Sequence, residues 1–181
     1  MKKPSKATLS AVSRAVKTAH AENRPLRLLF VCLGNICRSP AAEGMMREIA
    51  SEKGVELEID SCGFYGGHAG DLPDRRMRIA ARQRGLDLTH RSRKIRPTDF
   101  FYFDLIFGMD SQNIRDLHRA APTLEEDARI IPMADLAVRH PEVDAVPDPY
   151  YDGAEGFYNV LEILDDACSF LMSLIISDQT E

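Results

Sequence analysis

LRLLFV at residues 26–31 runs directly into CLGNICRSP at residues 32–40, and this junction sets the fold class. The first piece is short, apolar and preceded by a proline, which is typical of a buried strand. The second is a loop that contains glycine, and its Ser-Pro end opens a helical stretch that Gly54 stops. Residues 55–60 (VELEID) then alternate in polarity like a half-buried strand. Strand, loop, helix and strand within about 35 residues predict a βαβ unit.

The remainder of the chain keeps the alternation of strands and helices. Such alternation favours a parallel sheet flanked by helices. The sequence therefore predicts an α/β fold, a single three-layer domain with a four-stranded parallel sheet and helices on both faces. We expect helices at residues 74–84 and 156–176, a helix capped by Ser111 that ends near Arg119, strands at residues 105–109 and 130–131, and a Pro/Asp-rich loop at residues 139–153.

Composition narrows the class of protein. The 181 residues suit one domain of ordinary size, with 44% hydrophobic and 28% charged residues. A net charge of -5 excludes a bulk polycation that coats nucleic acid, and no apolar run approaches the roughly 18–20 residues of a membrane span. Four cysteines are too few for a disulfide scaffold at this length. We therefore expect free thiols in a cytoplasmic protein, with no nucleic-acid partner and no membrane span.

Residues 1–25 differ in charge from the rest of the chain. They carry six lysines and arginines against one acid, Glu22, so their net charge is 6 − 1 = +5 and the remaining chain carries −5 − 5 = −10. We interpret them as a basic N-terminal extension, either poorly ordered or a helix laid against an α/β domain at residues 26–181. A targeting or membrane-surface helix is the alternative. Small apolar residues recur in the extension at helical spacing: Leu9, Val12, Val16 and Ala19.

The loop after the first strand carries a candidate nucleophile, Cys32. Ligands of an open α/β sheet bind at the carboxyl ends of strands, near helix N-termini. Backbone N–H groups of residues 33–38 can curl around one anion, and the glycine and asparagine among them tolerate the positive φ that such a curl needs. Arg38 adds a planar fork for two oxygens of a tetrahedral anion, and Ser39 can steady a Cys32 thiolate. A cysteine-dependent phosphomonoesterase requires this combination. The expected phosphate-binding loop comprises Leu33, Gly34, Asn35, Ile36, Cys37 and Ser39.

The same cysteines allow two other interpretations. In the first, Cys32 and Cys37 are inert and act as small hydrophobic residues in a core. This interpretation fits Cys37 better than Cys32, because an inert Cys32 would leave Arg38 and Ser39 unexplained. A metal site formed by Cys32 and Cys37 is disfavoured, because zinc usually needs four ligands and Cys62 has no paired neighbour. We therefore expect no metal and no other cofactor.

The segment VCLGNICRSPAAEG at residues 31–44 resembles the signature loop of the low-molecular-weight protein tyrosine phosphatases. The resemblance runs from about Leu26 to the C-terminal helix, nearly all the chain after the extension. It rests on four further segments, residues 60–63 (DSCG), 88–93 (LTHRSR), 103–110 (FDLIFGMD) and 148–153 (DPYYDG).

The resemblance implies roles for residues inside and outside the loop. The implied catalytic residues are Cys32, Arg38 and Asp148, with Asp148 as general acid and base. Ser61 and His90 are expected to hold Asn35, and Asp110 is expected to tie down the loop. The expected cleft rim comprises Phe64, Tyr65, Tyr150 and Tyr151.

One position departs from the family pattern. Gly67 stands where the family often has a large aromatic residue that walls the substrate ring. We therefore expect one side of the cleft to be open, unless Phe64 or Tyr65 compensates. Cys37 is expected to protect Cys32 from irreversible oxidation through a reversible disulfide.

We therefore expect a protein tyrosine phosphatase that forms a phosphocysteine on Cys32. The expected substrate is a phosphorylated protein or a small phosphomonoester, and the expected state is a monomer. A thiol-dependent arsenate reductase of the same fold is one alternative, although such enzymes use extra shuttling cysteines and this chain has none between Cys62 and Cys168. A non-catalytic phosphate-binding module is the other, although a binder needs neither nucleophile nor acid.

Overall fold

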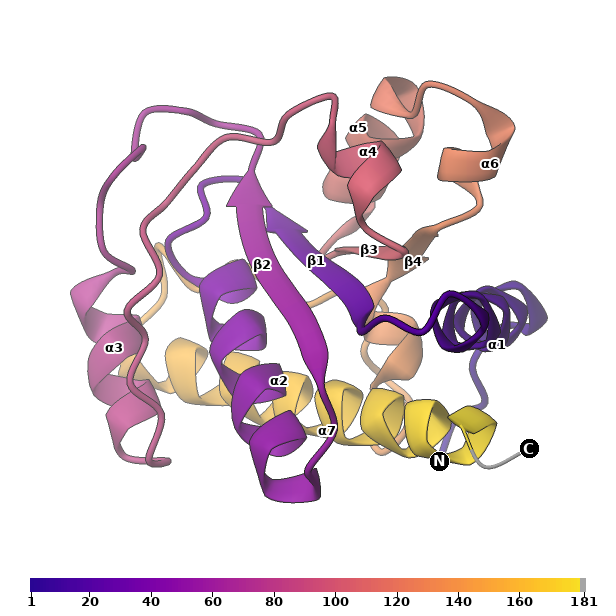
Figure 1. Ribbon diagram of the computed structural model, residues 1–181. Coiled ribbons are helices and arrows are strands. Elements are labelled where there is room, and N and C mark those ends of the chain that lie inside the picture. The colour runs from indigo at the N-terminus through magenta and orange to yellow at the C-terminus, as the bar shows by residue number, and fades with distance from the viewer. Residues whose placement is uncertain (180–181) are drawn as a thin grey trace.

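A parallel sheet of four strands forms the centre of the protein, as the sequence predicts (Figure 1). The computed structural model describes residues 1–179, so the last two residues of the predicted domain lie outside the described part. The spatial order is β2-β1-β3-β4, and each neighbouring pair is parallel. The strands are β1 (Leu26–Cys32), β2 (Leu57–Gly63), β3 (Leu105–Gly108) and β4 (Ile130–Pro132).

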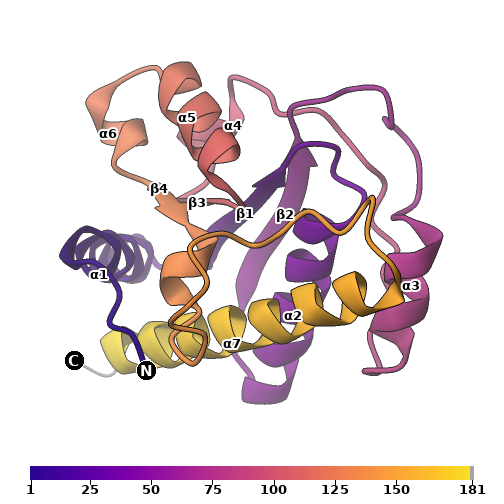
Figure 2. The ribbon, with the colours of Figure 1, turned by 180° about the vertical axis from the view of Figure 1, so that it is seen from behind.

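Helices cover both faces of the sheet (Figures 1 and 2). The larger layer contains α1 (Lys6–Ala21), α2 (Arg38–Lys53), α3 (Arg75–Arg82) and α7 (Ala154–Gln179). The opposite layer contains α4 (Asp99–Tyr102) and α5 (Ser111–Ala120). A short α6 (Leu124–Asp127) precedes β4, and the 3-10 turn η1 (Met133–Leu136) follows it.

Strand β1 is apolar from Leu28 to Cys32 because both of its faces are buried there, and the half-buried Arg27 near its start is the exception. Leu28, Phe30 and Cys32 join the core under α2 and α7, whereas Leu29 and Val31 join the core under α4 and α5. Alternate side chains of a strand point to opposite faces, so a central parallel strand has no polar face. The same alternation turns the Cys32 side chain toward the N-terminus of α2.

Several element boundaries differ from the expectations. Strand β2 begins at Leu57 rather than at residue 55, and α7 extends beyond residues 156–176 at both ends. Ser111 is the first residue of α5 and not its cap. The cap is Asp110, whose carboxylate accepts the N–H of Asn113 in a reciprocal capping box. Helices α4 and α6 and the turn η1 were not expected, because four residues are too few to show a helical period.

The basic N-terminal segment forms a helix that packs on the domain. Val12, Val16 and Ala19 of α1 are buried against the core shared with α7, whereas Leu9 is exposed. Ser5 caps the helix by accepting the N–H of Thr8. Within residues 1–179, no helix is both long and apolar enough to cross a membrane. The division of the chain at residue 25 stays a prediction.

A buried carboxylate on α7 fastens the loop that follows η1. Asp166 accepts hydrogen bonds from the Arg139 N–H (2.7 Å), the Arg139 Nε (2.9 Å) and His140 Nδ1 (2.9 Å). Burial alone would raise the pKa of Asp166, but the hydrogen bonds from His140 and Arg139 outweigh burial and lower its pKa. The loop is therefore tied to α7 by an ionised group.

We expect Asp166→Asn to lower the free energy of unfolding by about 1–3 kcal/mol at pH 7. The pKa of Asp166 is lower in the folded than in the unfolded protein, so its contribution is present above roughly pH 4 and is lost as the pH falls through the folded-state pKa. Urea unfolding at pH 7 and at pH 3.5 measures this. The gap between variant and wild type should narrow at the lower pH, and a gap that widens there contradicts the assignment. The neighbouring, more exposed Asp165→Asn is the matched control and should cost less.

Candidate active site

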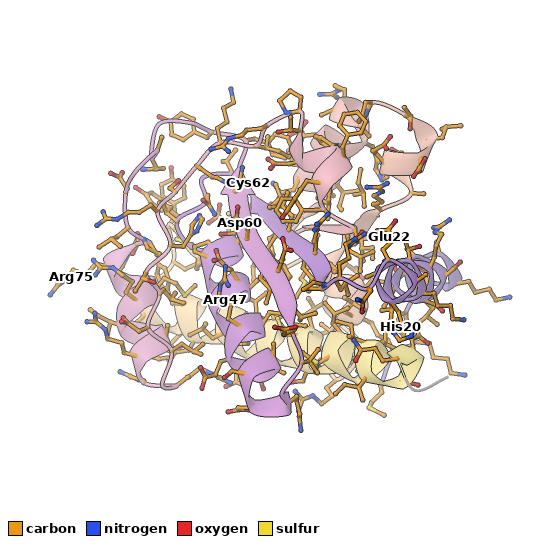
Figure 3. All side chains as sticks on the ribbon, in the orientation of Figure 1. His20, Glu22, Arg47, Asp60, Cys62 and Arg75 are labelled. Atoms are coloured by element: carbon orange, nitrogen blue, oxygen red, sulfur yellow. The ribbon has the colours of Figure 1, made fainter. Side chains whose placement is uncertain are left out.

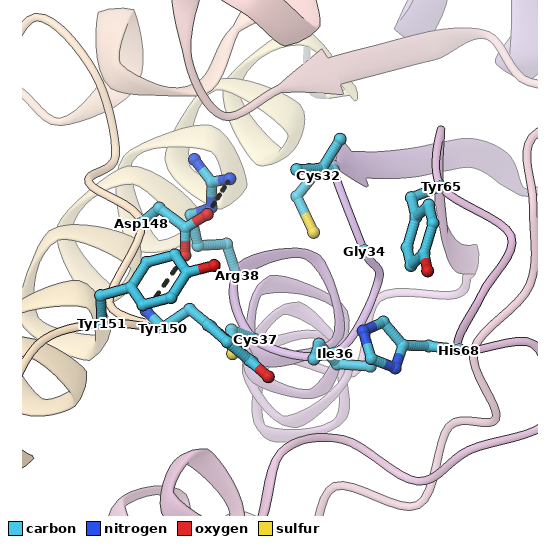
Figure 4. Close-up of a pocket in the computed structure, with 11 residues that line it drawn as sticks. Cys32, Gly34, Ile36, Cys37, Arg38, Tyr65, His68, Asp148, Tyr150 and Tyr151 are labelled. Atoms are coloured by element: carbon cyan, nitrogen blue, oxygen red, sulfur yellow. Dashed lines mark hydrogen bonds and ion pairs between the residues drawn. The ribbon is translucent and has the colours of Figure 1, made fainter.

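A cleft of about 230 Å³ opens where β1 ends and α2 begins (Figure 4). Cys32 lies at its floor, between the Arg38 and Asp148 side and the Tyr65 and His68 side. All three predicted catalytic residues therefore meet in one cavity. The lining residues are Cys32, Leu33, Gly34, Ile36, Cys37, Arg38, Tyr65, His68, Asp148, Tyr150 and Tyr151.

Two hydrogen-bonding groups of the loop and of α2 contact the Cys32 sulfur. The Asn35 N–H lies 3.3 Å from Sγ, and the Ser39 Oγ lies 3.0 Å from it. The Ser39 oxygen accepts a hydrogen bond from Asn35 Nδ2 (2.8 Å), and its own proton faces both the sulfur at 3.0 Å and, at a longer distance of 3.4 Å, the Cys62 carbonyl oxygen. Donors directed at sulfur stabilise thiolate relative to thiol. The site thus holds a nucleophile ready to react.

Asn35 adopts left-handed backbone, with φ 55°, and its buried side chain holds that conformation. Its Nδ2 donates to Ser39 and, at 2.9 Å, to Ser61 Oγ. Its Oδ1 accepts the Arg93 N–H at 3.0 Å and lies 2.9 Å from His90 Nε2. A backbone N–H can only donate, so the orientation of the amide is fixed. Ser61 and His90 therefore contact Asn35, where the resemblance expects them.

Glu43 of α2 contacts two of the residues that hold Asn35. It accepts the Ser61 hydroxyl at 2.6 Å, and its carboxylate lies 3.1 Å from His90 Nδ1. Both ring nitrogens of His90 thus face acceptors, and a ring protonated on both nitrogens donates to each. Asp60, in the middle of β2 (Figure 3), lies 3.6 Å from the same Nδ1. Within residues 1–179, Glu43, Asp60 and His90 are the one group of three potential metal ligands, but these atoms already serve one another and Asn35.

Arg38 is almost fully buried and joins three parts of the chain. Its Nη1 donates to Asp110 Oδ2 (2.6 Å) and to the Val146 carbonyl (3.1 Å), and its Nη2 donates to Asp148 Oδ2 (3.3 Å). Burial opposes the charge of Arg38, but the negative groups around it keep its pKa above the usual value. Asp110 in turn is held ionised: burial would raise its pKa, but the Asn113 N–H and Arg38 lower it. Asp110 thus reaches the loop through Arg38.

Two kinds of donor remain for an anion bound above the sulfur. Nε–H of Arg38 and one N–H on Nη2 have no hydrogen-bond partner in the described part of the chain, and a guanidinium can offer such N–H groups to two oxygens of an anion. Helix α2 begins at Arg38 without a side-chain cap and without an acid in its first turn. The free backbone N–H groups that line the cleft are those of Gly34, Ile36, Cys37 and Arg38.

Two aromatic pairs flank the cleft. Tyr150 and Tyr151 meet edge to face with centroids 5.0 Å apart, and Tyr65 meets His68 in the same way at 5.6 Å on the opposite side (Figure 4). A Cβ atom on Gly67 would overlap the Tyr65 ring, so the missing side chain at residue 67 is what admits that ring. The side of the cleft next to Gly67 is therefore walled by Tyr65 rather than open.

Phe64 does not belong to the rim. It packs against the core on the α4 and α5 face of the sheet, because its side chain points away from the cleft. The residue at the rim is instead His68, whose Nδ1 lies 3.4 Å from Asp71. His68 was missed because a single histidine in a glycine-rich loop carries no periodic signal.

Gly63 and Glu43 were also missed by sequence reasoning. A Cβ on Gly63 would lie 2.6 Å from the Leu33 carbonyl oxygen and 2.9 Å from the Asn35 nitrogen, so only glycine lets β2 approach the loop. The DSCG segment contains this glycine, and a glycine that ends a strand is a usable signal of close backbone approach. Glu43 follows the loop by one helical turn, but nothing in the sequence indicates that its carboxylate is buried.

The other three cysteines are buried thiols. Burial raises the pKa of Cys37, Cys62 and Cys168 above the usual value, and for Cys37 the charges of Asp74 and Cys32 add to the effect. All four cysteines are free. The proposed regulatory disulfide between Cys32 and Cys37 stays a prediction.

Known proteins resemble this chain in sequence and in fold. The sequence profile of the family described as "Low molecular weight phosphotyrosine protein phosphatase" matches residues 27–180. A low molecular weight phosphotyrosine protein phosphatase of Schizosaccharomyces pombe is 39% identical over 154 residues, which cover 82% of this chain and 97% of the relative. A protein tyrosine phosphatase from Entamoeba histolytica has a structure that superposes with a TM-score of 0.81 at 38% identity, covering 85% and 99% of the two chains. A Drosophila arginine phosphatase superposes with a TM-score of 0.77 at 29% identity, covering 82% and 96%.

Among the four cysteines, we expect Cys32 to react first with iodoacetate at neutral pH. The other three stay protonated because burial raises their pKa, whereas Cys32 receives two hydrogen bonds at the floor of an open cleft. Peptide mapping by mass spectrometry after brief labelling measures the order. Inorganic phosphate should slow the labelling of Cys32, and Arg38→Met should remove that protection. Faster labelling of Cys37 would contradict the assignment.

Proposed function

Because the chain belongs to the low molecular weight phosphotyrosine protein phosphatase family, we propose that it hydrolyses aryl phosphate monoesters with Cys32 as the nucleophile. The observation that carries the proposal is the meeting of Cys32, Arg38 and Asp148 in one cleft. A phosphorylated protein or a small phosphoester is the substrate class. The proposal assigns phosphate binding to Arg38 and proton transfer to Asp148.

In the first step the Cys32 thiolate attacks phosphorus and the bond to the leaving oxygen breaks. The Arg38 guanidinium and the loop N–H groups hold the three non-bridging oxygens, where negative charge is greatest in the transition state. Asp148 gives its proton to the leaving oxygen. Support for this assignment comes from its carboxylate, which lines the cleft, is about half exposed and makes only a long 3.3 Å contact with Arg38.

In the second step water attacks the phosphocysteine. Asp148, now ionised, takes a proton from that water, and the Cys32 thiolate leaves as phosphate forms. The hydrogen bonds that Cys32 accepts from Ser39 and Asn35 stabilise the leaving thiolate. The positive charge is supplied by Arg38 and the helix N-terminus, so the cycle as proposed uses groups of this chain alone.

An aromatic leaving group fits the cleft best. The Tyr150–Tyr151 and Tyr65–His68 pairs offer ring faces and edges on two opposite sides of Cys32, and apolar Leu33 and Ile36 also line the cavity. These contacts support phosphotyrosine over a short alkyl phosphate. We further propose a reducing, cytoplasmic setting, because the nucleophile must stay a free thiol, and a monomeric state.

Arsenate reduction is less well supported. It needs a second and third thiol that can pass electrons to Cys32, but Cys62 and Cys168 are fully buried and burial raises the pKa of both. Phosphate binding without catalysis is also less well supported, because it gives no reason to place Asp148 beside a nucleophile.

We expect Cys32→Ser to lower the turnover of p-nitrophenyl phosphate by at least about 10⁴-fold, because the serine hydroxyl is not ionised at neutral pH. Asp148→Ala should cost about 10²-fold or more with phenyl phosphate and less with better leaving groups. Assays with EDTA and both substrates measure this. The matched control is Cys168→Ala, which removes a thiol from the α7 core and should leave turnover close to wild type. Full activity of Cys32→Ser would overturn the proposal.

We expect Gly67→Ala to raise the KM for a phosphotyrosine peptide about three- to tenfold, because the new Cβ displaces the Tyr65 ring from the cleft wall. Tyr65→Ala should have a similar effect, and a small alkyl phosphate should be affected by neither change. Gly66→Ala is the matched control, since its Cβ would meet only Lys94 at 3.5 Å. Unchanged KM values for Gly67→Ala and Tyr65→Ala would contradict the role of Tyr65 as a wall of the cleft. A phosphoarginine peptide is assayed beside the phosphotyrosine peptide as the competing substrate.

A further inference from the structure

The residues that precede α1 lie against the loop that leads to Asp148. Figure 2 shows them beside the loop that follows η1. The Lys2 N–H donates to the Val138 carbonyl at 2.9 Å, and the Lys2 Nζ donates to the Val143 carbonyl at 2.6 Å. The Ser5 N–H donates to the Asp135 carboxylate at 3.0 Å. Residues 2–5 therefore grip one continuous segment at three points.

That segment delivers two groups to the active site. Val146 follows Val143 by three residues, and its N–H donates to the Met109 carbonyl at 2.8 Å while its own carbonyl accepts Arg38 Nη1 at 3.1 Å. Asp148 follows two residues later, between Pro147 and Pro149. The two prolines limit the backbone angles on either side of the acid. Val143 is therefore joined to Asp148 by a short stretch in which Val146 is fastened to Met109 and Arg38 and the two prolines stiffen the backbone next to the acid.

Asp148 has few contacts of its own to fix its position. Its carboxylate makes the 3.3 Å contact with Arg38 and accepts the Tyr150 N–H at 3.1 Å. The general acid must be protonated when it acts, and a neutral carboxyl is attracted to Arg38 less strongly than a carboxylate. A bound phosphate also draws on the same guanidinium. During the first step the backbone has to hold the acid in place.

In addition to the contacts of Val146, two sets of contacts anchor the part of the loop that precedes it. Asp166 of α7 holds Arg139 and His140 from one side, and Lys2 holds Val138 and Val143 from the other. The segment from residue 139 to residue 153 contains no helix or strand, so these tethers stand where a sheet or helix would otherwise fix the chain. The Lys2 tether comes from outside residues 27–180, which the family profile matches.

We propose that Lys2 is a positioning residue, which holds the Val138–Val143 segment so that Asp148 stays over the leaving oxygen. This inference rests on the proposed function and extends it to the N-terminal segment. This role differs from that of a basic surface, which residues 1–25 would provide through their net positive charge. Lys2 acts instead through a hydrogen bond from its side chain to one carbonyl group. Loss of the tether should weaken proton transfer to the leaving group and leave the thiolate and the phosphate site intact.

The test compares Lys2→Met with Lys3→Met in the full chain. Both changes remove one positive charge from neighbouring positions, but Lys3 is exposed and makes no hydrogen bond in the described part of the chain. The readout is kcat/KM for a series of aryl phosphates whose leaving phenols differ in acidity. This quantity reports the step in which Asp148 donates its proton.

We expect Lys2→Met to lower kcat/KM about three- to tenfold for phenyl phosphate and to leave the value for p-nitrophenyl phosphate close to wild type. Asp135→Ala, which removes the acceptor of the Ser5 N–H, should give a smaller change in the same direction. Lys3→Met should match wild type across the series. Rates of iodoacetate labelling at Cys32 should be equal in all variants.

Two results would overturn the inference while leaving the proposed function in place. One is a Lys2→Met profile that matches wild type, and the other is an equal loss for every leaving group, which would indicate a merely structural role. Both are read against Asp148→Ala, which must show the steep dependence on the leaving group. A flat Asp148→Ala profile would instead remove Asp148 as the acid, and the inference with it.

Discussion

The buried amide of Asn35 is the constraint on which the active site depends. A left-handed backbone at a residue other than glycine costs energy, so surrounding contacts must hold it. Four groups from three segments do so: Ser39 of α2, Ser61 of β2, and His90 and the Arg93 N–H of the loop that precedes α4. The same turn directs the Asn35 N–H at sulfur and leaves the following N–H groups free for an anion. The loop is thus shaped before substrate arrives, and no reorganisation is needed in the transition state.

Arg38 connects the phosphate-binding loop to the rest of the fold. A guanidinium with so little exposure needs negative partners, and Asp110 supplies one at the end of β3 while Asp148 supplies another from the far loop. The Val146 carbonyl adds a neutral acceptor. One side chain therefore fixes where three segments meet, and it keeps N–H groups for the ligand. Arg38 thus serves both to bind the phosphate and to hold the segments together, so replacing it must affect both.

The sequence predicts the sheet and the floor of the cleft well, because those features have local signals. LRLLFV is apolar at every position except Arg27, as expected of a strand buried on both faces, and the CLGNICRS loop has its nucleophile, turn residues and arginine within seven positions of one another. The residues behind the loop have no such signal. Glu43 looks like any helical acid until Ser61 and His90 surround it, and the Phe64 and Tyr65 side chains point to opposite sides although the sequence treats them alike. Only tertiary packing separates these cases.

Both edges of the sheet are poor templates for further strands. Strand β4 has three residues and ends in Pro132, which has no N–H to offer a neighbour. At the other edge the carboxyl end of β2 is paired by the 93–95 segment, since Gly63 donates to the Arg93 carbonyl and accepts the Ile95 N–H. The open stretch that precedes it carries Glu58 and Asp60, which pair with Arg27 and Arg93, so this edge is lined by charged groups rather than apolar ones. Addition of a strand from a second chain is therefore disfavoured at both edges, which lowers the tendency of the protein to aggregate through its sheet.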